Sequence, residues 1–252
     1  MRWIYLCPHP DDAALCAGGL IFDQAQRGQQ VEIWTLMAGV PEGEELSEFA
    51  RQMHAKWGTA SARQTIELRR AEDRQAASVL GAEPVHFDFL DAIYRRGADG
   101  QPLYGEPVGA PVSPGDASLA AQISREVRER LSPDDKVICL MGIGGHVDHV
   151  LVRKAAELLG RALLYVADFP YVLNHPETVP AATAGLRSSP QQVSEAGLSA
   201  WVEAVESYRS QLSTVFGDTE AEAAIRAYHA SAGGVQFWSL PGGGALDSGQ
   251  NP

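Results

Sequence analysis

Cysteine is scarce in this sequence, and long apolar runs are missing from it. The three cysteines, Cys7, Cys16 and Cys139, are odd in number and show no Cys-x-x-Cys spacing. This pattern gives no support for a cysteine zinc site and favours reduced thiols in a cytoplasmic protein. Because no stretch reaches about 18 consecutive apolar residues, we expect no membrane span. The apolar segment 3–7 is too short for the core of a signal peptide.

Positive charge is also in short supply. The chain has 20 Lys and Arg against 32 Asp and Glu, which gives a net charge of −12. No run of basic residues interrupts this balance, so we expect neither nucleic acid nor an anionic membrane surface as a partner. The length of 252 residues suits one α/β domain. We expect that domain to occupy residues 1–240 and the Gly-rich tail 241–252 to be disordered. No pattern indicates an oligomeric state.

Short apolar runs alternate with helical patterns along the chain. Predicted strands occupy residues 3–7, 31–37, 84–89, 136–141 and 162–167. Predicted helices occupy residues 14–27, 65–80, 118–131 and 149–159, with further helical segments at 200–216 and 220–230. This alternation indicates βαβ units and therefore a Rossmann-like, doubly wound, mostly parallel sheet flanked by helices.

Three long connections interrupt the alternation, at residues 38–64, 95–117 and 169–199. Long loops in a compact domain are often functional lids, and the first of these is the best lid candidate. It contains His54 and Trp57, for which packing is favoured over stacking on a sugar ring.

Histidine and aspartate gather in two short motifs, each directly after a predicted strand. His-Pro-Asp-Asp at 9–12 follows the first strand, and His-Val-Asp-His at 146–149 follows the fourth. In a sheet of order 3-2-1-4-5 these two strands are neighbours at the switch point, where ligands bind at the carboxyl ends of the strands. We therefore expect the two motifs to meet in space.

The residue types in these motifs suit metal-assisted hydrolysis of an amide. Two imidazoles and one carboxylate are a common open zinc site, which His9, Asp12 and His149 can supply. The side chain of Asp11 diverges from that of Asp12, and it can take a proton from the attacking water. His146 can donate to the oxyanion or to the leaving nitrogen, with Asp148 holding it cationic and oriented.

Each motif taken alone also fits the capped start of a helix, so the prediction depends on the two occurring together. Two other interpretations stay open. The turn Gly142-Ile143-Gly144-Gly145 is compatible with a non-catalytic or nucleotide-binding Rossmann-like module, although it lacks the full GxGxxG spacing. A metal hydrolase of another amide, or of an ester, fits the same residues. Asp168 and Tyr171 follow the fifth strand and are candidates for the pocket wall.

Over residues 2–170 the sequence resembles the PIG-L/LmbE family of zinc-dependent N-acetylglucosaminyl de-N-acetylases. The two motifs quoted above carry the resemblance. Three further segments match family features: Arg69-Arg70-Ala71-Glu72, Asp91 in Phe89-Leu90-Asp91, and Tyr208-Arg209-Ser210-Gln211.

The resemblance implies a deacetylase of the linear-amide type that acts on a small amino-sugar-containing molecule. It implies Zn²⁺ as the cofactor, although the same donors accept Fe²⁺, Mn²⁺ or Co²⁺. The implied residues are His9, Asp12 and His149 as metal ligands, Asp11 as general base, His146 as general acid with Asp148 in support, and Arg69 (or Arg70) with Asp91 as substrate contacts.

Two positions depart from the family pattern. Ala13 stands where the family often has Glu, and Pro8 replaces a frequent Ala. The implied metal ligands are unaffected, so these departures bear on the identity of the substrate.

Overall fold

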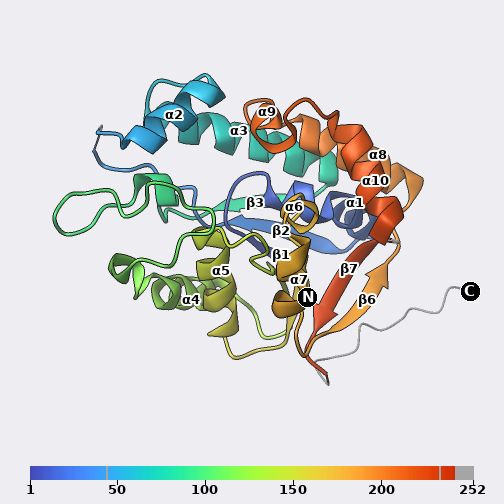
Figure 1. Cartoon of the computed structure of the whole chain (residues 1–252). Coiled ribbons are helices and arrows are strands. Elements are labelled where there is room, and N and C mark those ends of the chain that lie inside the picture. The colour runs from blue at the N-terminus through green and yellow to red at the C-terminus, as the bar shows by residue number, and fades with distance from the viewer. Residues whose placement is uncertain (44, 233, 242–252) are drawn as a thin grey trace, which may run out of the picture.

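The computed structural model describes residues 1–43, 45–232 and 234–241, and a seven-stranded sheet runs through its centre (Figure 1). The strand order is β3-β2-β1-β4-β5-β7-β6. The first five of these are parallel to one another: β3 (Glu83–His86), β2 (Gln30–Thr35), β1 (Arg2–Cys7), β4 (Lys136–Leu140) and β5 (Leu163–Val166). The predicted order and the mostly parallel sheet are confirmed.

Two strands at one edge were not predicted. β7 (Val235–Ser239) pairs antiparallel with β5, and β6 (Arg187–Gln191) pairs antiparallel with β7. The sequence of β6, Arg-Ser-Ser-Pro-Gln, has no apolar alternation because this edge strand is largely exposed. Its proline is tolerated because an edge strand does not need every backbone donor.

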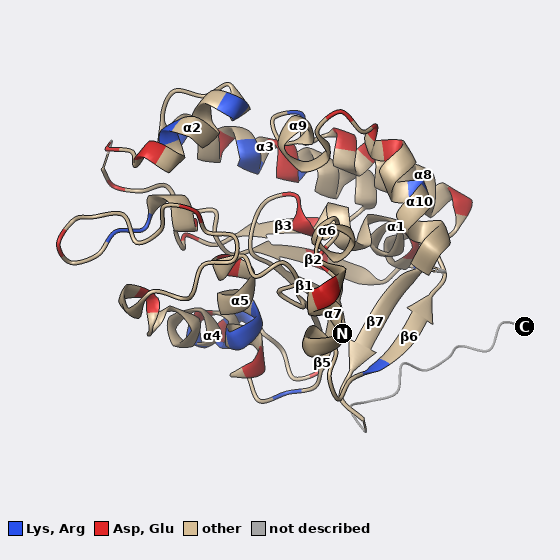
Figure 2. Cartoon of the chain, in the orientation of Figure 1, with Lys and Arg blue, Asp and Glu red and all other residues tan. Residues whose placement is uncertain are grey.

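Helices cover both faces of the sheet (Figure 1). Four pack on one face: α1 (Asp12–Gln26), α3 (Ala62–Leu80), α8 (Glu195–Glu206) and α10 (Ala221–Ala232). Two pack on the other face: α4 (Leu119–Arg130) and α5 (Val147–Glu157). Most charged residues lie on helices and loops rather than on strands (Figure 2).

The sequence of β1 is almost continuously apolar because helices cover both faces of this strand. Trp3, Tyr5 and Cys7 point into the core under α1 and α8. Ile4 and Leu6 point into the core under α4 and α5. Successive side chains of a strand alternate between faces, so a strand that is covered on both sides is apolar at every position.

The ends of α3 follow from local sequence. The Ser61 side chain accepts a hydrogen bond from the backbone N–H of Gln64, which caps the helix start. Gly81 ends the helix in the left-handed region, at φ 69°, where glycine has no steric penalty. The predicted helix and its glycine stop are confirmed.

The long connections contain more structure than their sequences predicted. Residues 38–64 include α2 (Glu48–Trp57), and residues 169–199 include α6 (Tyr171–Asn174), α7 (Val179–Ala182) and β6. The predicted helix 200–216 is divided into α8 and α9 (Leu212–Phe216). Of the predicted disordered tail, residues 242–252 lie outside the described residues. Among the helices that the structure describes, none combines the length and hydropathy that crossing a membrane requires.

Helices α1 and α8 approach closely because α1 carries two adjacent glycines. A Cβ atom on Gly18 would lie 2.7 Å from Cδ1 of Trp201, and one on Gly19 would lie 2.5 Å from Cγ1 of Val193. Trp201 is fully buried, and its indole N–H donates to the carbonyl of Leu15 at 3.2 Å. This indole has no room to move away from an added methyl group.

We therefore predict that Gly18→Ala destabilises the protein. Overpacking of a filled core costs about 1–3 kcal/mol, which exceeds the roughly 1 kcal/mol that alanine gains over glycine in a helix. Urea unfolding should show a lower midpoint for Gly18→Ala. The control is Gly105→Ala, where an added Cβ meets nothing within 4 Å. A Gly18→Ala protein as stable as the control would refute this packing argument.

Candidate metal centre

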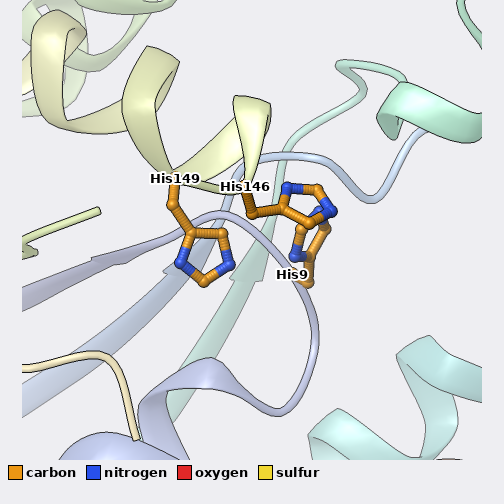
Figure 3. A group of neighbouring side chains, drawn as sticks. All are labelled: His9, His146 and His149. Atoms are coloured by element: carbon orange, nitrogen blue, oxygen red, sulfur yellow. The ribbon is translucent and has the colours of Figure 1, made fainter. Parts of the chain in front are cut away.

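The two histidine-aspartate motifs meet at the carboxyl ends of β1 and β4. His9 lies in the turn between β1 and α1, while His146 is the N-cap of α5 and His149 lies in its first turn. The centroid of the His9 ring lies 4.8 Å from that of the His146 ring and 5.4 Å from that of the His149 ring. Figure 3 shows the three imidazoles grouped between α5 and the His9 turn. The neighbouring positions of β1 and β4 produce this meeting, as the predicted strand order requires.

The carboxylate of Asp12 lies between two of these imidazoles. Its Oδ2 is 3.6 Å from Nδ1 of His9, and its Oδ1 is 3.6 Å from Nε2 of His149. Donors that each lie about 2.1 Å from one zinc ion are separated by roughly 3.4 Å in a tetrahedral arrangement. Each imidazole thus lies at about this spacing from one oxygen of Asp12, and the donor types of His9, Asp12 and His149 suit a zinc ion.

Each of the two imidazoles is held through its other nitrogen by a buried carboxylate. Nε2 of His9 lies 2.9 Å from Oδ2 of Asp148, and Nδ1 of His149 lies 2.7 Å from Oδ1 of Asp168. Asp168 also accepts backbone N–H groups of Gly142 and Ile143. Carboxylates in this position fix the tautomer and the orientation of metal-binding histidines. The nitrogens left free are the two that face Asp12.

The electrostatics of His149 follow from the same contacts. Burial lowers its pKa, but Asp12 and Asp168 outweigh burial and raise the pKa to about 9. Metal binding at Nε2 must therefore displace a proton, as metal binding at histidine generally does.

His146 also offers a nitrogen to the centre. Ligand atoms of His9, His146 and His149 lie within 4.8 Å of one another, as do those of His9, Asp91 and Asp148. Nδ1 of His146 accepts the backbone N–H of Asp148 at 3.2 Å, so its Nε2 is the atom available to the pocket. Burial, followed by the neighbouring His9, holds the pKa of His146 well below its usual value. This shift favours the neutral imidazole, whereas we expected Asp148 to hold His146 as a cation.

The carboxylate of Asp148 faces His9 and not His146, which also differs from expectation. It accepts the backbone N–H of Ala92 at 3.0 Å and Nη1 of Arg95 at 2.5 Å. Arg95 in turn donates through Nε to Asp116 at 2.8 Å, and Tyr104 donates its hydroxyl to the same carboxylate at 2.7 Å. Burial alone would raise the pKa of Asp148, but Arg95 and His9 more than offset it and lower that pKa below its usual value.

Arg95 and Asp116 support the candidate site through Asp148, and the sequence did not indicate them. They stand at the two ends of the Gly- and Pro-rich connection 95–117, where no periodicity marks them. Their pairing across the loop is visible in the structure but leaves no pattern in the sequence.

Asp11 occupies a strained backbone position beside the centre. Its φ of 101° is the single positive value among the described residues other than glycine, and strain of this kind is concentrated at functional sites. Arg69 donates to the carbonyl of Pro10 at 3.0 Å and lies 3.5 Å from Oδ2 of Asp11. Burial raises the pKa of Asp11 to about 7, even though Arg69 acts to lower it.

Arg69 connects Asp11 with the predicted substrate contact Asp91. Its Nη1 lies 3.6 Å from Oδ2 of Asp91, and the other oxygen of Asp91 caps the short turn at Ile93. The neighbouring Arg70 points elsewhere, to the exposed Asp88 and to the carbonyl of Ala38. Arg69 is therefore the arginine of this pair that faces the site.

A pocket of about 200 Å³ opens onto the centre. Seven of the eight predicted site residues line it, namely His9, Asp11, Asp12, Arg69, Asp91, His146 and His149. The eighth, Asp148, is fully buried behind His9. Tyr171 also lines the pocket, whereas Ala13, in the first turn of α1, belongs to the apolar core. A larger cavity of about 570 Å³ lies at the amino ends of β4 and β5, and it contains none of these imidazoles.

The segment after α8 reaches the pocket because α3 anchors it. Glu72 accepts both the backbone N–H and the hydroxyl of Ser210, at 2.8 and 2.6 Å, and Asp73 accepts the hydroxyl of Tyr208 at 2.7 Å. These contacts interrupt the helix predicted over 200–216 and bring Gln211 to the pocket wall.

Arg95 provides a test of this arrangement. Arg95→Met leaves Asp148 without its guanidinium partner, so His9 loses a fixed orientation. Loss of such an outer partner typically costs 10- to 100-fold in metal affinity. We predict that loss for zinc, measured by competition with a chelator on folded protein. The control is Arg96→Met, because Arg96 donates to loop carbonyls away from the centre. Equal zinc affinity in the wild type and Arg95→Met would contradict the assignment.

Comparisons with known proteins agree with this geometry. Residues 4–159 match the family described as PIG-L: GlcNAc-PI de-N-acetylase. A 2'-N-acetylparomamine deacetylase of Streptomyces fradiae is 30% identical over 175 residues, which cover 68% of this chain and 57% of that protein. A 1D-myo-inositol 2-acetamido-2-deoxy-alpha-D-glucopyranoside deacetylase of Corynebacterium diphtheriae is 34% identical over 167 residues, which cover 66% and 53%. The chain thus matches little more than half the length of these relatives.

Solved structures extend the similarity over almost the whole chain. A deacetylase from the biosynthesis pathway of teicoplanin has a TM-score of 0.83 and 27% identity, covering 95% of this chain and 97% of that one. A zinc-inhibited form of a teicoplanin deacetylase has a TM-score of 0.80 and 26% identity, with the same coverage. Motifs, fold and matched length together show that this chain belongs to the PIG-L family.

Proposed function

We propose that this protein is a zinc-dependent deacetylase that hydrolyses the N-acetyl amide of a small amino-sugar-containing molecule. The observation that supports it most directly is the Asp12 carboxylate, which lies 3.6 Å from a free nitrogen of both His9 and His149. Membership of the family and the deacetylase activities named for the relatives support the same reaction.

His9, Asp12 and His149 would hold the metal. When bound, a zinc ion supplies Lewis acidity and lowers the pKa of a water molecule. Two imidazoles and a carboxylate also accept Fe²⁺, Mn²⁺ and Co²⁺. One relative was solved as a zinc-inhibited form, so Fe²⁺ belongs beside Zn²⁺ in any reconstitution.

Asp11 and His146 would handle the protons of amide hydrolysis. Asp11 accepts a proton from water as the water oxygen adds to the acyl carbon. The C–N bond then breaks, and the leaving nitrogen takes up the proton that Asp11 accepted from water. Because Nδ1 of the neutral His146 accepts the backbone N–H of Asp148, its own hydrogen is on Nε2. That hydrogen can bond to the developing oxyanion. Asp148 therefore orients His146 through its backbone and His9 through its carboxylate.

Arg69 and Asp91 would bind hydroxyl groups of the sugar. Both line the pocket and are 4–5% exposed. Their separation of 3.6 Å places a charge-assisted donor beside a charge-assisted acceptor, and a pair of this kind suits a hydroxyl group, which both donates and accepts.

A nucleotide-binding module is less consistent with the glycine turn at 142–145. The backbone N–H groups of Gly142 and Ile143, which a phosphate would need, already donate to Asp168. A Cβ atom on Gly144 would lie 2.6 Å from the Tyr171 ring, so close packing explains this glycine. A panel of acyl donors tests the alternative that the protein hydrolyses an ester or another amide.

The proposal also covers the cellular location of the protein, its domain organisation and its partner. All three cysteines are free and buried, which suits a reducing cytoplasm. We further propose that residues 1–240 act as one domain and that the partner is a small molecule.

Asp11→Asn separates the proposed base from the proposed ligands. We predict that it lowers kcat by about 10²- to 10⁴-fold, the range for loss of a general base, while bound metal is retained. His149→Ala should lose the metal as well as turnover. Elemental analysis measures the bound metal, and acetate release from N-acetylglucosamine conjugates measures turnover. The control is Asp88→Asn, which changes an exposed aspartate paired with Arg70. Normal turnover by Asp11→Asn would show that the base is misassigned.

A further inference from the structure

The lining of the pocket combines the imidazoles and carboxylates of the metal centre with apolar side chains from several elements. Helix α2 contributes Phe49, Met53 and Trp57. Val108, which is 37% exposed and pairs with His146 through an isolated β-bridge, also lines the pocket.

The three α2 residues form one stripe along the helix. Phe49, Met53 and Trp57 are spaced four residues apart, and residues at this spacing share a face. The other faces of α2 carry exposed polar residues such as Gln52 and Lys56, and Figure 2 shows charged residues along this helix. The stripe is therefore the one apolar surface that α2 turns toward the pocket.

Helix α2 is fixed in place before any ligand binds. The Ser47 side chain accepts the backbone N–H of Ala50, which caps the helix start. His54 is 2% exposed, and its Nε2 lies 2.8 Å from the hydroxyl of Tyr94. Because the helix is anchored at these points, the stripe is a preformed wall, and little ordering entropy opposes binding to it.

The stripe adjoins the side of the pocket proposed to bind sugar hydroxyls. The guanidinium carbon of Arg69 lies 5.1 Å from the centroid of the Trp57 ring. Ile93, whose N–H is held by Asp91, also lines the pocket. If Arg69 and Asp91 bind the sugar as proposed, a group that rests on this wall is attached to the sugar rather than to the acyl carbon.

We propose that the pocket contains a subsite for an apolar aglycone, lined by Phe49, Met53, Trp57 and Val108. The substrate class is then an N-acylated amino sugar with an aromatic or alkyl group attached through its glycosidic oxygen. The proposal rests on the proposed function for its reaction. Phe49 and Met53 are only partly buried, and covering apolar side chains at such a surface favours binding.

The test compares the methyl and p-nitrophenyl β-glycosides of N-acetylglucosamine, with methyl N-octanoylglucosaminide as a third substrate. Burying an aryl group on this wall should raise kcat/KM by about 10- to 100-fold over the methyl glycoside. Phe49→Ala combined with Met53→Ala should reduce that ratio to about threefold or less, mainly through KM. The control Lys56→Ala, on the same helix and exposed, should keep the wild-type ratio.

Calorimetric binding of methyl and p-nitrophenyl glucoside, which have no acyl group, separates the two proposals. If no substrate is hydrolysed but the aryl glucoside binds more tightly in a Phe49- and Met53-dependent way, the reaction is misassigned and the subsite stands. Equal binding of the two glucosides overturns the subsite. A preference for the N-octanoyl compound over the aryl glycoside also overturns it, because the wall would then hold the acyl chain.

Discussion

Five aspartate carboxylates are buried around one pocket, and their mutual repulsion is the constraint on which the rest of the site depends. They are Asp11, Asp12, Asp91, Asp148 and Asp168, none more than 8% exposed. Burying charge without compensation costs several kcal/mol per ion. Arg69 and Arg95 offset part of this charge from two sides of the site. A divalent cation beside Asp12 would offset more, so the proposed metal would contribute to the electrostatic balance as well as to the chemistry.

The compensation is arranged in two layers. Behind the imidazoles, Asp148 and Asp168 are satisfied by backbone N–H groups and by Arg95, and they orient His9 and His149. In front of the imidazoles, the remaining carboxylates face the pocket. Every carboxylate oxygen of the rear layer therefore accepts a hydrogen bond, while the front layer keeps oxygen atoms available for a metal, a proton or a sugar hydroxyl. The neighbouring positions of β1 and β4 allow both layers to form.

The sequence predicted the centre but not its supports. His9 and His149 were predictable because each motif directly follows a buried strand, and few strand orders are compatible with alternating strands and helices. Arg95 was not, because it acts through a loop without periodicity on a residue 53 positions away. The sequence predicted Asp148 as a site residue but paired its carboxylate with His146 instead of His9. The direction of this side chain depends on its contact with Arg95 in the connection 95–117. The four-residue spacing of Phe49, Met53 and Trp57 was readable, but their stretch was taken for a loop.

In the proposed function, the fold fixes the reaction through the metal centre, and the long connections select the substrate through the apolar stripe. The reaction depends on the ligand set. X-ray absorption spectroscopy of the purified protein reconstituted with one equivalent of zinc tests that set most directly. The account predicts one ion bound by two imidazoles and carboxylate oxygen, with one imidazole contribution lost in His149→Ala. A zinc site of three imidazoles in the wild type, with Asp12→Ala leaving the spectrum unchanged, would contradict it.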